Sequence, residues 1–422
     1  MTATDQPAAT EDYQGGPIGD GRTALTDHQP EDIDALRAIV RDEVARGRAI
    51  YPRGGGTALD SGGIPRKPGV VVDTRSLGRL VDYPAADMTI TAEAGMTLSA
   101  LRVILAEQQQ RLLIDAPHAD RATLGGIYAT NTCGSRRYGA GRPRDQIIGV
   151  SFVTSDGALV KGGGRVVKNV AGYDFPKLLT GSMGTLGVIV QLTLKVRPIP
   201  EASAIVWVPL ANSADVAARL DGLNTSATRP IALDLLNAPA ARAIGQGLGL
   251  PEGPAVLVIG FEDNADAVRW QVDRVRDELA APEAAVVEGE RASTLWDALN
   301  GFPADGPGSL GFTANIRPAA VAAFAAELDP SRWSVQAHAG NGIVRAFALG
   351  EWALDEAARA IEPLRRRAVH EGGNLILPRC PTDWKERLRV WGEPRADQFL
   401  AERVRAALDP HNAMNPGRFV VG

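Results

Sequence analysis

Apolar residues recur at helical spacing in two stretches near the start of the chain. In the first stretch, Pro30 and the acidic pair Glu31 and Asp32 suit an initial turn, so the pattern predicts a helix over residues 30–46. Its apolar stripe consists of Ile33, Leu36, Ile39, Val40 and Val44. In the second stretch, Thr97 suits a helix cap and the apolar spacing predicts a helix to about residue 110.

Short apolar, β-branched runs separated by glycine predict strands in the same half of the chain. We expect them at residues 49–51, 70–72, 89–92, 147–154, 159–161 and 188–196. Short strands with intervening helices and frequent glycine are typical of an α+β domain.

Two prolines at 198 and 200 end the last of these strands and mark a domain boundary. Beyond it, expected strands at 204–208, 255–261 and 342–348 alternate with expected helices at 213–221, 264–280, 318–328 and 353–371. This pattern favours an antiparallel sheet backed by helices. We therefore expect a loose N-terminus (1–20), an α+β domain (20–198), a cap domain (199–400) and a final segment (401–422) that returns to the first domain.

Composition excludes several classes of protein. The chain of 422 residues is 45% hydrophobic and 23% charged, as in soluble globular proteins, and its formal net charge of −5 argues against a nucleic-acid-binding protein. Its two cysteines, Cys133 and Cys380, are too few for a disulfide scaffold, a zinc module or an iron–sulfur cluster. We find no apolar run of membrane-spanning length and no secretion signal, so we expect a cytoplasmic protein.

Two glycine-rich segments carry the first candidate chemistry. Arg53-Gly54-Gly55-Gly56-Thr57 follows a predicted strand. Successive glycines there can adopt positive φ and aim several N–H groups at a phosphate, although a flexible turn has the same composition. Further along the chain, Thr123-Leu124-Gly125-Gly126 would let a flat or phosphorylated ligand approach the backbone, or would simply form a tight turn into a helix.

A third glycine segment, at residues 181–187, precedes a strand instead of following one, and no helix opens from it. It therefore does not match the dinucleotide fingerprint of a Rossmann fold.

Together these segments resemble one family. Arg-Gly-Gly-Gly-Thr at 53–57, Thr-Leu-Gly-Gly at 123–126, Tyr-Asp at 173–174 and Gly-Ser-Met-Gly-Thr-Leu-Gly-Val-Ile at 181–189 occur in the order found in PCMH-type (vanillyl-alcohol-oxidase-like) FAD-binding proteins. Asn-Pro-Gly-Arg at 415–418 resembles the close of the C-terminal domain of FAD-linked oxidases. Within this family the chain resembles the FAD-binding subunit of bacterial glycolate oxidase.

The resemblance implies FAD as cofactor and assigns its contacts. The pyrophosphate loop would be Arg53, Gly54, Gly55, Gly56, Thr57 and Ala58; the second wall would be Pro117, Thr123, Leu124, Gly125, Gly126, Thr130 and Gly134; the adenosine part would meet Gly184, Gly187 and Ile189; Asn415 and Arg418 would approach the isoalloxazine. The glycine loop lacks the histidine that attaches FAD covalently in some relatives, so the resemblance implies noncovalent binding.

The catalytic group is less clearly marked. Relatives that oxidise 2-hydroxy acids carry a histidine-rich metal and base site in the cap domain. Here His338 resembles its first half, and His370-Glu371-Gly372 stands where a second motif is expected, without a paired histidine. We therefore take His338 as the catalytic candidate, or else as a packed core histidine, and expect no metal.

The function that the resemblance implies is oxidation of glycolate to glyoxylate by an FAD subunit that relays electrons. Its partners would be a sister flavin subunit and an iron–sulfur subunit, with peripheral attachment to the inner membrane through them. Isolated, the chain would then oxidise glycolate poorly. Alternatives are a self-sufficient FAD-dependent 2-hydroxy-acid (D-lactate-like) dehydrogenase and a non-catalytic flavin-holding assembly subunit. The segment at 384–395, with Trp384 and Trp391, is a surface loop or a docking surface for such partners.

Overall fold

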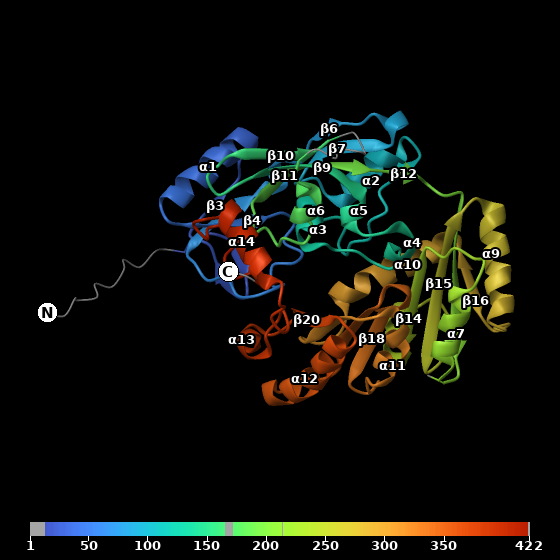
Figure 1. Cartoon of the computed structure of the whole chain (residues 1–422). Helices are drawn as coiled ribbons and strands as arrows, with labels where there is room; N and C mark the ends of the chain where they lie inside the picture. Colours follow the sequence, from blue (N-terminus) through green and yellow to red (C-terminus); the bar gives the residue numbers. More distant parts are fainter. Residues whose placement is uncertain (1–12, 165–171, 213, 421–422) are drawn as a thin grey trace.

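The computed structural model describes residues 13–164, 172–212 and 214–420 of the chain. Two lobes are visible in Figure 1, an N-terminal α+β domain and a cap domain built on one large sheet. Part of the expected loose N-terminus, residues 1–12, lies outside the described residues. Within the rest of it, residues 17–19 form a strand.

Two sheets form the core of the first domain. A parallel sheet has the order β3 (Asp27–His28), β5 (Gly69–Asp73), β4 (Ala49–Arg53). An antiparallel sheet has the order β10 (Leu159–Gly163), β9 (Ile147–Val153), β11 (Val188–Lys195), β7 (Thr89–Glu93), β6 (Leu80–Asp82). Two small pairs join β1 (Pro17–Gly19) to β2 (Arg22–Thr23) and β8 (Gln110–Arg111) to β12 (Arg197–Pro198).

Helices cover these sheets. They are α1 (Ile33–Ala45), α2 (Leu98–Ala106), α3 (Leu124–Thr130), α4 (Arg137–Ala140), α5 (Pro143–Gln146) and α6 (Phe175–Leu179). Both predicted helices form but are shorter than expected. Helix α1 begins at Ile33 because the Asp32 side chain accepts a hydrogen bond from the Ala35 amide at 2.8 Å and so caps the helix from outside it.

The cap domain contains the expected antiparallel sheet, with eight strands. Their order is β16 (Ala285–Glu288), β13 (Ala202–Leu210), β15 (Ala255–Asp263), β14 (Ala232–Asn237), β18 (Trp333–His338), β19 (Ile343–Ala348), β17 (Gly311–Asn315), β20 (Asn374–Arg379). Every pairing in it is antiparallel. The sequence predicts β13, β15 and β19, and misses the other five strands.

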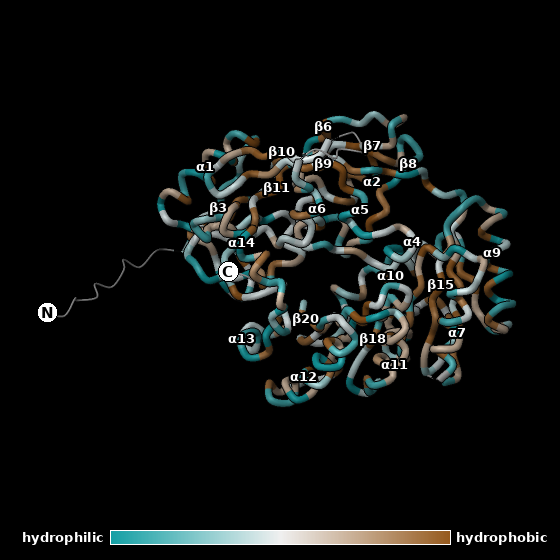
Figure 2. The backbone as a smooth tube through the Cα atoms, in the orientation of Figure 1, coloured by the Kyte–Doolittle hydropathy of each residue, from teal (hydrophilic) through white to brown (hydrophobic). Residues whose placement is uncertain are grey.

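The cap sheet buries its two faces differently. One face packs on α7 (Ala214–Asn224), α9 (Ala265–Glu278), α11 (Val321–Ala326) and α12 (Leu354–His370), and part of the other packs on α8 (Ala238–Ile244) and α10 (Gly289–Asp305). Figure 2 shows the apolar strands inside and polar helix surfaces outside. Because successive side chains of a strand point to opposite faces, the second face can also carry polar residues toward the first domain.

The end of the chain returns to the first domain. Helix α13 (Lys385–Leu388) lies to the left of the cap sheet, on the side of β20, and α14 (Gln398–Leu408) lies against the first domain (Figure 1). Beyond α14, Met414 pairs in parallel with Ile50 of β4, and the Ile50 carbonyl accepts a hydrogen bond from the Asn415 amide at 2.9 Å. Residues 413–415 thus extend the parallel sheet at its β4 edge.

Candidate functional site

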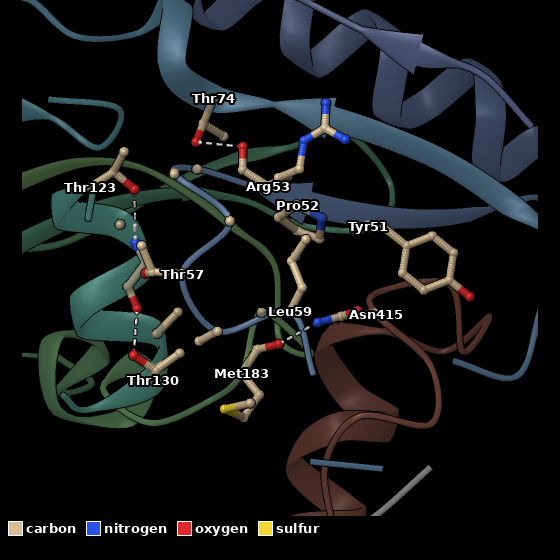
Figure 3. Close-up of a pocket in the computed structure, with 18 of the residues that line it drawn as sticks. Tyr51, Pro52, Arg53, Thr57, Leu59, Thr74, Thr123, Thr130, Met183 and Asn415 are labelled. Carbon is tan, nitrogen blue, oxygen red and sulfur yellow. Dashed lines mark hydrogen bonds between the residues drawn. The ribbon is translucent and has the colours of Figure 1, made fainter. Parts of the chain in front are cut away.

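A cleft opens in the first domain. Its walls come from segments that are far apart in the sequence but meet here (Figure 3). Of the residues predicted to contact FAD, those that line the cleft are Arg53, Gly54, Gly55, Gly56, Thr57, Ala58, Thr123, Gly125, Gly126, Thr130, Gly184, Gly187, Ile189, Asn415 and Arg418.

Three predicted residues do not line this cleft. Leu124 is fully buried in the core, and Pro117 does not reach the cleft wall. Gly134 is enclosed at the domain interface, since a Cβ there would lie 2.3 Å from Asn300 Oδ1 and 2.6 Å from Asp115 Cβ.

The glycine loop needs glycine mainly because it touches the opposite wall. A Cβ at Gly54 would lie 2.0 Å from Thr123 Oγ1, and one at Gly55 would lie 1.8 Å from the Arg121 carbonyl oxygen. Of the three glycines only Gly56 has positive φ, at +69°. The expectation that successive glycines adopt positive φ is therefore wrong for Gly54 and Gly55. Gly55 is required because it lies against the Arg121 backbone, and Gly54 because it lies against the Thr123 side chain.

The cleft fits a phosphate-bearing ligand such as FAD. Within the described residues, the backbone N–H groups of Gly55, Gly56 and Thr57 donate no hydrogen bond to the protein, as in an anion-binding nest. Gly184 lines the same cleft and has positive φ, at +71°. Unpaired backbone donors in a glycine-lined cleft are what a pyrophosphate requires.

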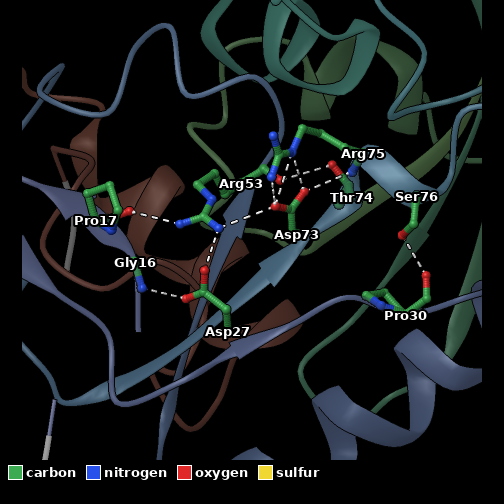
Figure 4. A network of polar contacts seen from close by, with 9 residues as sticks. All are labelled: Gly16, Pro17, Asp27, Pro30, Arg53, Asp73, Thr74, Arg75 and Ser76. Carbon is green, nitrogen blue, oxygen red and sulfur yellow. Dashed lines mark hydrogen bonds and ion pairs between the residues drawn. The ribbon is translucent and has the colours of Figure 1, made fainter. Parts of the chain in front are cut away.

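The Arg53 side chain supports the loop from behind instead of entering the cleft (Figure 4). Its guanidinium pairs with Asp27 at 2.5 Å and with Asp73 at 3.2 Å. Burial acts to raise the pKa of Asp73, but hydrogen bonds from Arg75 and Arg53 outweigh it and hold that pKa below its usual range. A ligand in the cleft would therefore contact the Arg53 backbone and not its guanidinium, which is paired with Asp27 and Asp73.

Arg418 and Asn415 reach the cleft but are also engaged. The Arg418 guanidinium pairs with Asp20 at 2.5 Å, and Asn415 Nδ2 donates to the Met183 carbonyl at 2.6 Å. Burial lowers the pKa of Arg418, although Asp20 opposes this shift. The cation expected near the isoalloxazine is thus neutralised in part by a buried carboxylate.

A second cluster of polar groups lies where the cap sheet meets the first domain. In the sheet register, Asp234 pairs with His338, and Arg345 pairs with Gln336. Gln336 and His338 are two apart on β18, so these four side chains share one face. The first domain meets this face with the segment that follows α3: Ser135 Oγ donates to Asp234 Oδ2 at 2.5 Å.

His338 is held in one orientation at the end of β18. Its side chain is 1% exposed, and its Nδ1 lies 2.7 Å from Asp234 Oδ1. Because a carboxylate only accepts, Nδ1 carries the proton and Nε2 is left with a lone pair. Nε2 has no hydrogen-bond partner among the described residues. Burial lowers the pKa of His338 against the opposing effect of Asp234, so the ring is neutral.

Arg345 and Arg379 of the cap domain could each bind an anion, but they differ in how many of their donors are already used within the protein. Arg379 is committed to main-chain carbonyls at the end of α10, including Gly306 at 2.5 Å, and makes no ion pair in the described structure. Arg345 makes one hydrogen bond, of 2.9 Å, to the Cys133 carbonyl. It therefore keeps donors for a ligand beside His338.

The remaining sequence candidates have structural roles. Trp384 and Trp391 pack against the cap core, and Trp391 Nε1 donates to the Arg418 carbonyl at 3.0 Å. Burial raises the pKa of Cys380 to about 12, so its thiol stays protonated. Among the described residues no group of His, Cys, Asp and Glu could hold a metal ion, and no helix there is long and apolar enough to cross a membrane.

Comparison with curated proteins gives whole-chain and partial matches. The chain is 25% identical to glycolate oxidase subunit GlcD of Bacillus subtilis, covering 97% of this chain and 90% of that protein. It is 38% identical to glycolate oxidase subunit GlcE of Escherichia coli over 32% of this chain and 39% of that protein. A third relative, the D-2-hydroxyglutarate dehydrogenase of Xanthomonas citri, is 34% identical over 43% of this chain, which spans 38% of that protein's length.

Solved structures share the fold over nearly the whole chain. A 4-ethylphenol oxidase from Gulosibacter chungangensis superposes with a TM-score of 0.71 at 15% identity, covering 97% of this chain and 91% of that one. Residues 27–163 match the family described as FAD binding domain, and residues 199–322 match the family of FAD linked oxidases, C-terminal domain. The first match contains the glycine loop and α3, and the second contains Asp234. The chain therefore carries a PCMH-type FAD-binding domain followed by the C-terminal domain of the FAD-linked oxidases; it is an FAD-dependent oxidoreductase, and FAD is its cofactor.

Proposed function

We propose that this protein oxidises a small 2-hydroxy acid, with FAD as the hydride acceptor. The observation that carries the proposal is the row Asp234, His338 and Arg345 on the cap sheet. It contacts Cys133 and Ser135, only a few residues beyond Thr130, which lines the cleft. An imidazole and a guanidinium thus lie beside the segment that leads out of the FAD cleft.

The two groups match the two needs of the substrate. His338 is neutral, and its Nε2 lone pair would accept the proton of the α-hydroxyl group. Asp234 keeps the proton on Nδ1 and stabilises the imidazolium that forms. Arg345 would bind the carboxylate and fix the α-carbon. FAD, when bound, supplies the acceptor for the hydride that leaves the α-carbon.

We further propose glycolate as the substrate and a multi-subunit oxidase as the setting. The likeness to two subunits named for glycolate oxidase supports this, and a sister flavin subunit and an iron–sulfur subunit would carry electrons onward. The second candidate is a self-sufficient D-lactate-like dehydrogenase. A D-lactate dehydrogenase of Arabidopsis thaliana, 27% identical over 88% of this chain, favours it.

One experiment tests the chemistry and separates the candidates. The FAD-loaded chain is assayed with an artificial electron acceptor and with each of three substrates, glycolate, D-lactate and D-2-hydroxyglutarate. The assay is carried out without and with a GlcD-type subunit, and the His338→Ala variant is measured in parallel. We expect the isolated chain to oxidise glycolate slowly and the other two acids not at all. Addition of a GlcD-type subunit should accelerate glycolate oxidation. His338→Ala should abolish glycolate oxidation both by the isolated chain and by the complex. Fast turnover of the isolated chain, on the order of 10 per second, would favour the self-sufficient dehydrogenase. Full activity of His338→Ala in the complex would reject this chain as the catalytic subunit.

A further inference from the structure

A buried carboxylate joins four segments of the chain next to the FAD cleft. Asp20 follows β1, and its side chain is 1% exposed. Its two oxygens pair with Arg418 Nη1 and with Lys385 Nζ, each at 2.5 Å. Thr382 Oγ1 donates to Asp20 Oδ1 at 3.1 Å, and the Asp20 amide donates to Asp60 Oδ1 at 2.7 Å. Both cations therefore depend on one carboxylate.

Main-chain carbonyls also accept hydrogen bonds from both cations of the cluster. Lys385 Nζ has three acceptors, since it also donates to the carbonyls of Asp60 at 2.5 Å and Gly62 at 3.0 Å. Arg418 donates in addition to the carbonyls of Gly63 and Ile18. Such a network is stable only when every member is present, because a buried charge that loses its partner is costly.

The cluster holds part of the cleft wall in place. Pro17 and Ile18 of β1 line the cleft, together with Arg418. The β1–β2 hairpin has strands of only three and two residues, too short to be stable by itself. Its position therefore depends on what anchors it, and the buried anchor at its turn is Asp20. One of the two ion pairs leads to the cap domain, where Lys385 begins α13.

We propose that Asp20 is a latch that controls the exchange of FAD. Its ion pairs with Arg418 and Lys385 hold the β1–β2 hairpin against the cleft, so that FAD enters or leaves when the hairpin separates from the cap domain. Asp20 acts through the hairpin and is a positioning residue. The proposal rests on the FAD cleft alone and does not depend on the substrate.

Asp20→Asn tests the latch with little change to the backbone. Asp20 has φ 56°, a conformation that asparagine also tolerates. The rate of FAD release is measured by ultrafiltration of the loaded protein, and the melting temperature is measured with and without FAD. We expect release to be at least about ten-fold faster and the stabilisation by added FAD to be smaller. The matched control is Asp266→Asn, which removes an exposed carboxylate (91% exposed) and should release FAD at the wild-type rate.

Lys385→Met is the second variant, and it keeps the Asp20–Arg418 pair. Lys385 does not line the cleft, so it can affect FAD release only through the groups it holds, which are Asp20 and the carbonyls of Asp60 and Gly62. We expect faster release here too, to a smaller extent than in Asp20→Asn. If both variants lose melting temperature equally with and without FAD but release FAD at the wild-type rate, the cluster is only a structural cross-link and the proposal is overturned. If Asp20→Asn does not fold, an unchanged release rate in Lys385→Met overturns it in the same way.

Discussion

Arg345 of the cap domain donates a hydrogen bond of 2.9 Å to the carbonyl oxygen of Cys133 in the FAD-binding domain. This contact brings a guanidinium across the domain interface to the segment that follows α3. It also distinguishes Arg345 from Arg379, which is saturated by carbonyls at the end of α10.

Replacing each arginine by methionine tests which one binds the substrate carboxylate. Because a hydrogen bond to a charged group is worth about 1.5–3 kcal/mol, we expect Arg345→Met to raise KM about ten- to hundred-fold. Arg379→Met is the matched control and should lower the melting temperature with little effect on KM. Steady-state kinetics and thermal melts measure both. A larger KM effect in Arg379→Met would reverse the assignment.

Asp234→Asn tests the orientation of the base. The amide can donate to Nδ1 and so move the proton to Nε2, which leaves no lone pair for the substrate hydroxyl. We expect kcat to fall by about 100-fold or more, while FAD content stays normal because Asp234 does not line the cleft. Steady-state rates and the visible flavin spectrum are measured together. Normal kcat with normal FAD content would show that His338 is not the base.

The acid limit of activity follows from the burial of His338. Because its pKa lies below the ordinary 6.5, the ring stays neutral down to that pH, and we expect kcat/KM to fall only at lower pH. The same shift links folding to pH. Because the pKa of His338 is lower in the folded state than in the unfolded state, burial of the neutral ring contributes stability above pH 6.5. That stability is lost as the pH falls toward the folded-state pKa of His338. Melting temperatures from about pH 8 to about pH 5 should therefore decline less in His338→Asn than in the wild type.

Gly55→Val should abolish FAD loading. A Cβ at this position would already lie 1.8 Å from the Arg121 carbonyl oxygen, so the loop must separate from the opposite wall and the cleft loses its shape. The measurement is the ratio of flavin to protein absorbance in the purified variant. Gly222→Ala is the control, because a Cβ there meets nothing within 4 Å. A folded Gly55→Val protein with normal FAD content would show that the loop does not hold the cofactor.

FAD should leave the denatured protein intact. The glycine loop contains no histidine that could attach it, and Cys380, whose pKa burial raises to about 12, is a poor nucleophile. Acid or heat treatment followed by filtration should place all flavin in the filtrate. Yellow colour that stays with the precipitated polypeptide would mean a covalent bond.

The parts that the sequence predicts are those whose signal is local. The glycine segments and the helix over 33–45 depend on residues close together in the chain, and they were found. Five cap strands were missed. In two of them, β14 and β18, Asp234 and His338 interrupt the apolar pattern. These two polar residues also belong to the candidate site, so the residues that concealed the strands are the ones proposed to meet the substrate.

Contacts between side chains that are far apart in the sequence could not be predicted. Asp234 and His338 are 104 residues apart, and Asp20 and Arg418 are 398 apart. Nothing in the local pattern marks such pairs, because each is created by the register of a sheet or by the closure of two domains. Arg53 illustrates the same limit: the sequence places it in the loop, but only the fold shows that Asp27 and Asp73 hold its charge away from the cleft.

The pairing of Met414 with Ile50 has a consequence for the order of events during synthesis. Strand β4 emerges from the ribosome long before the residues that complete its edge, 413–415, because the whole cap domain is translated between them. Asn415 and Arg418, which line the cleft, follow the cap domain in the same way. The cofactor pocket is therefore completed only after the cap domain has been translated, and a nascent chain truncated after the first domain would expose an unpaired strand edge to aggregation.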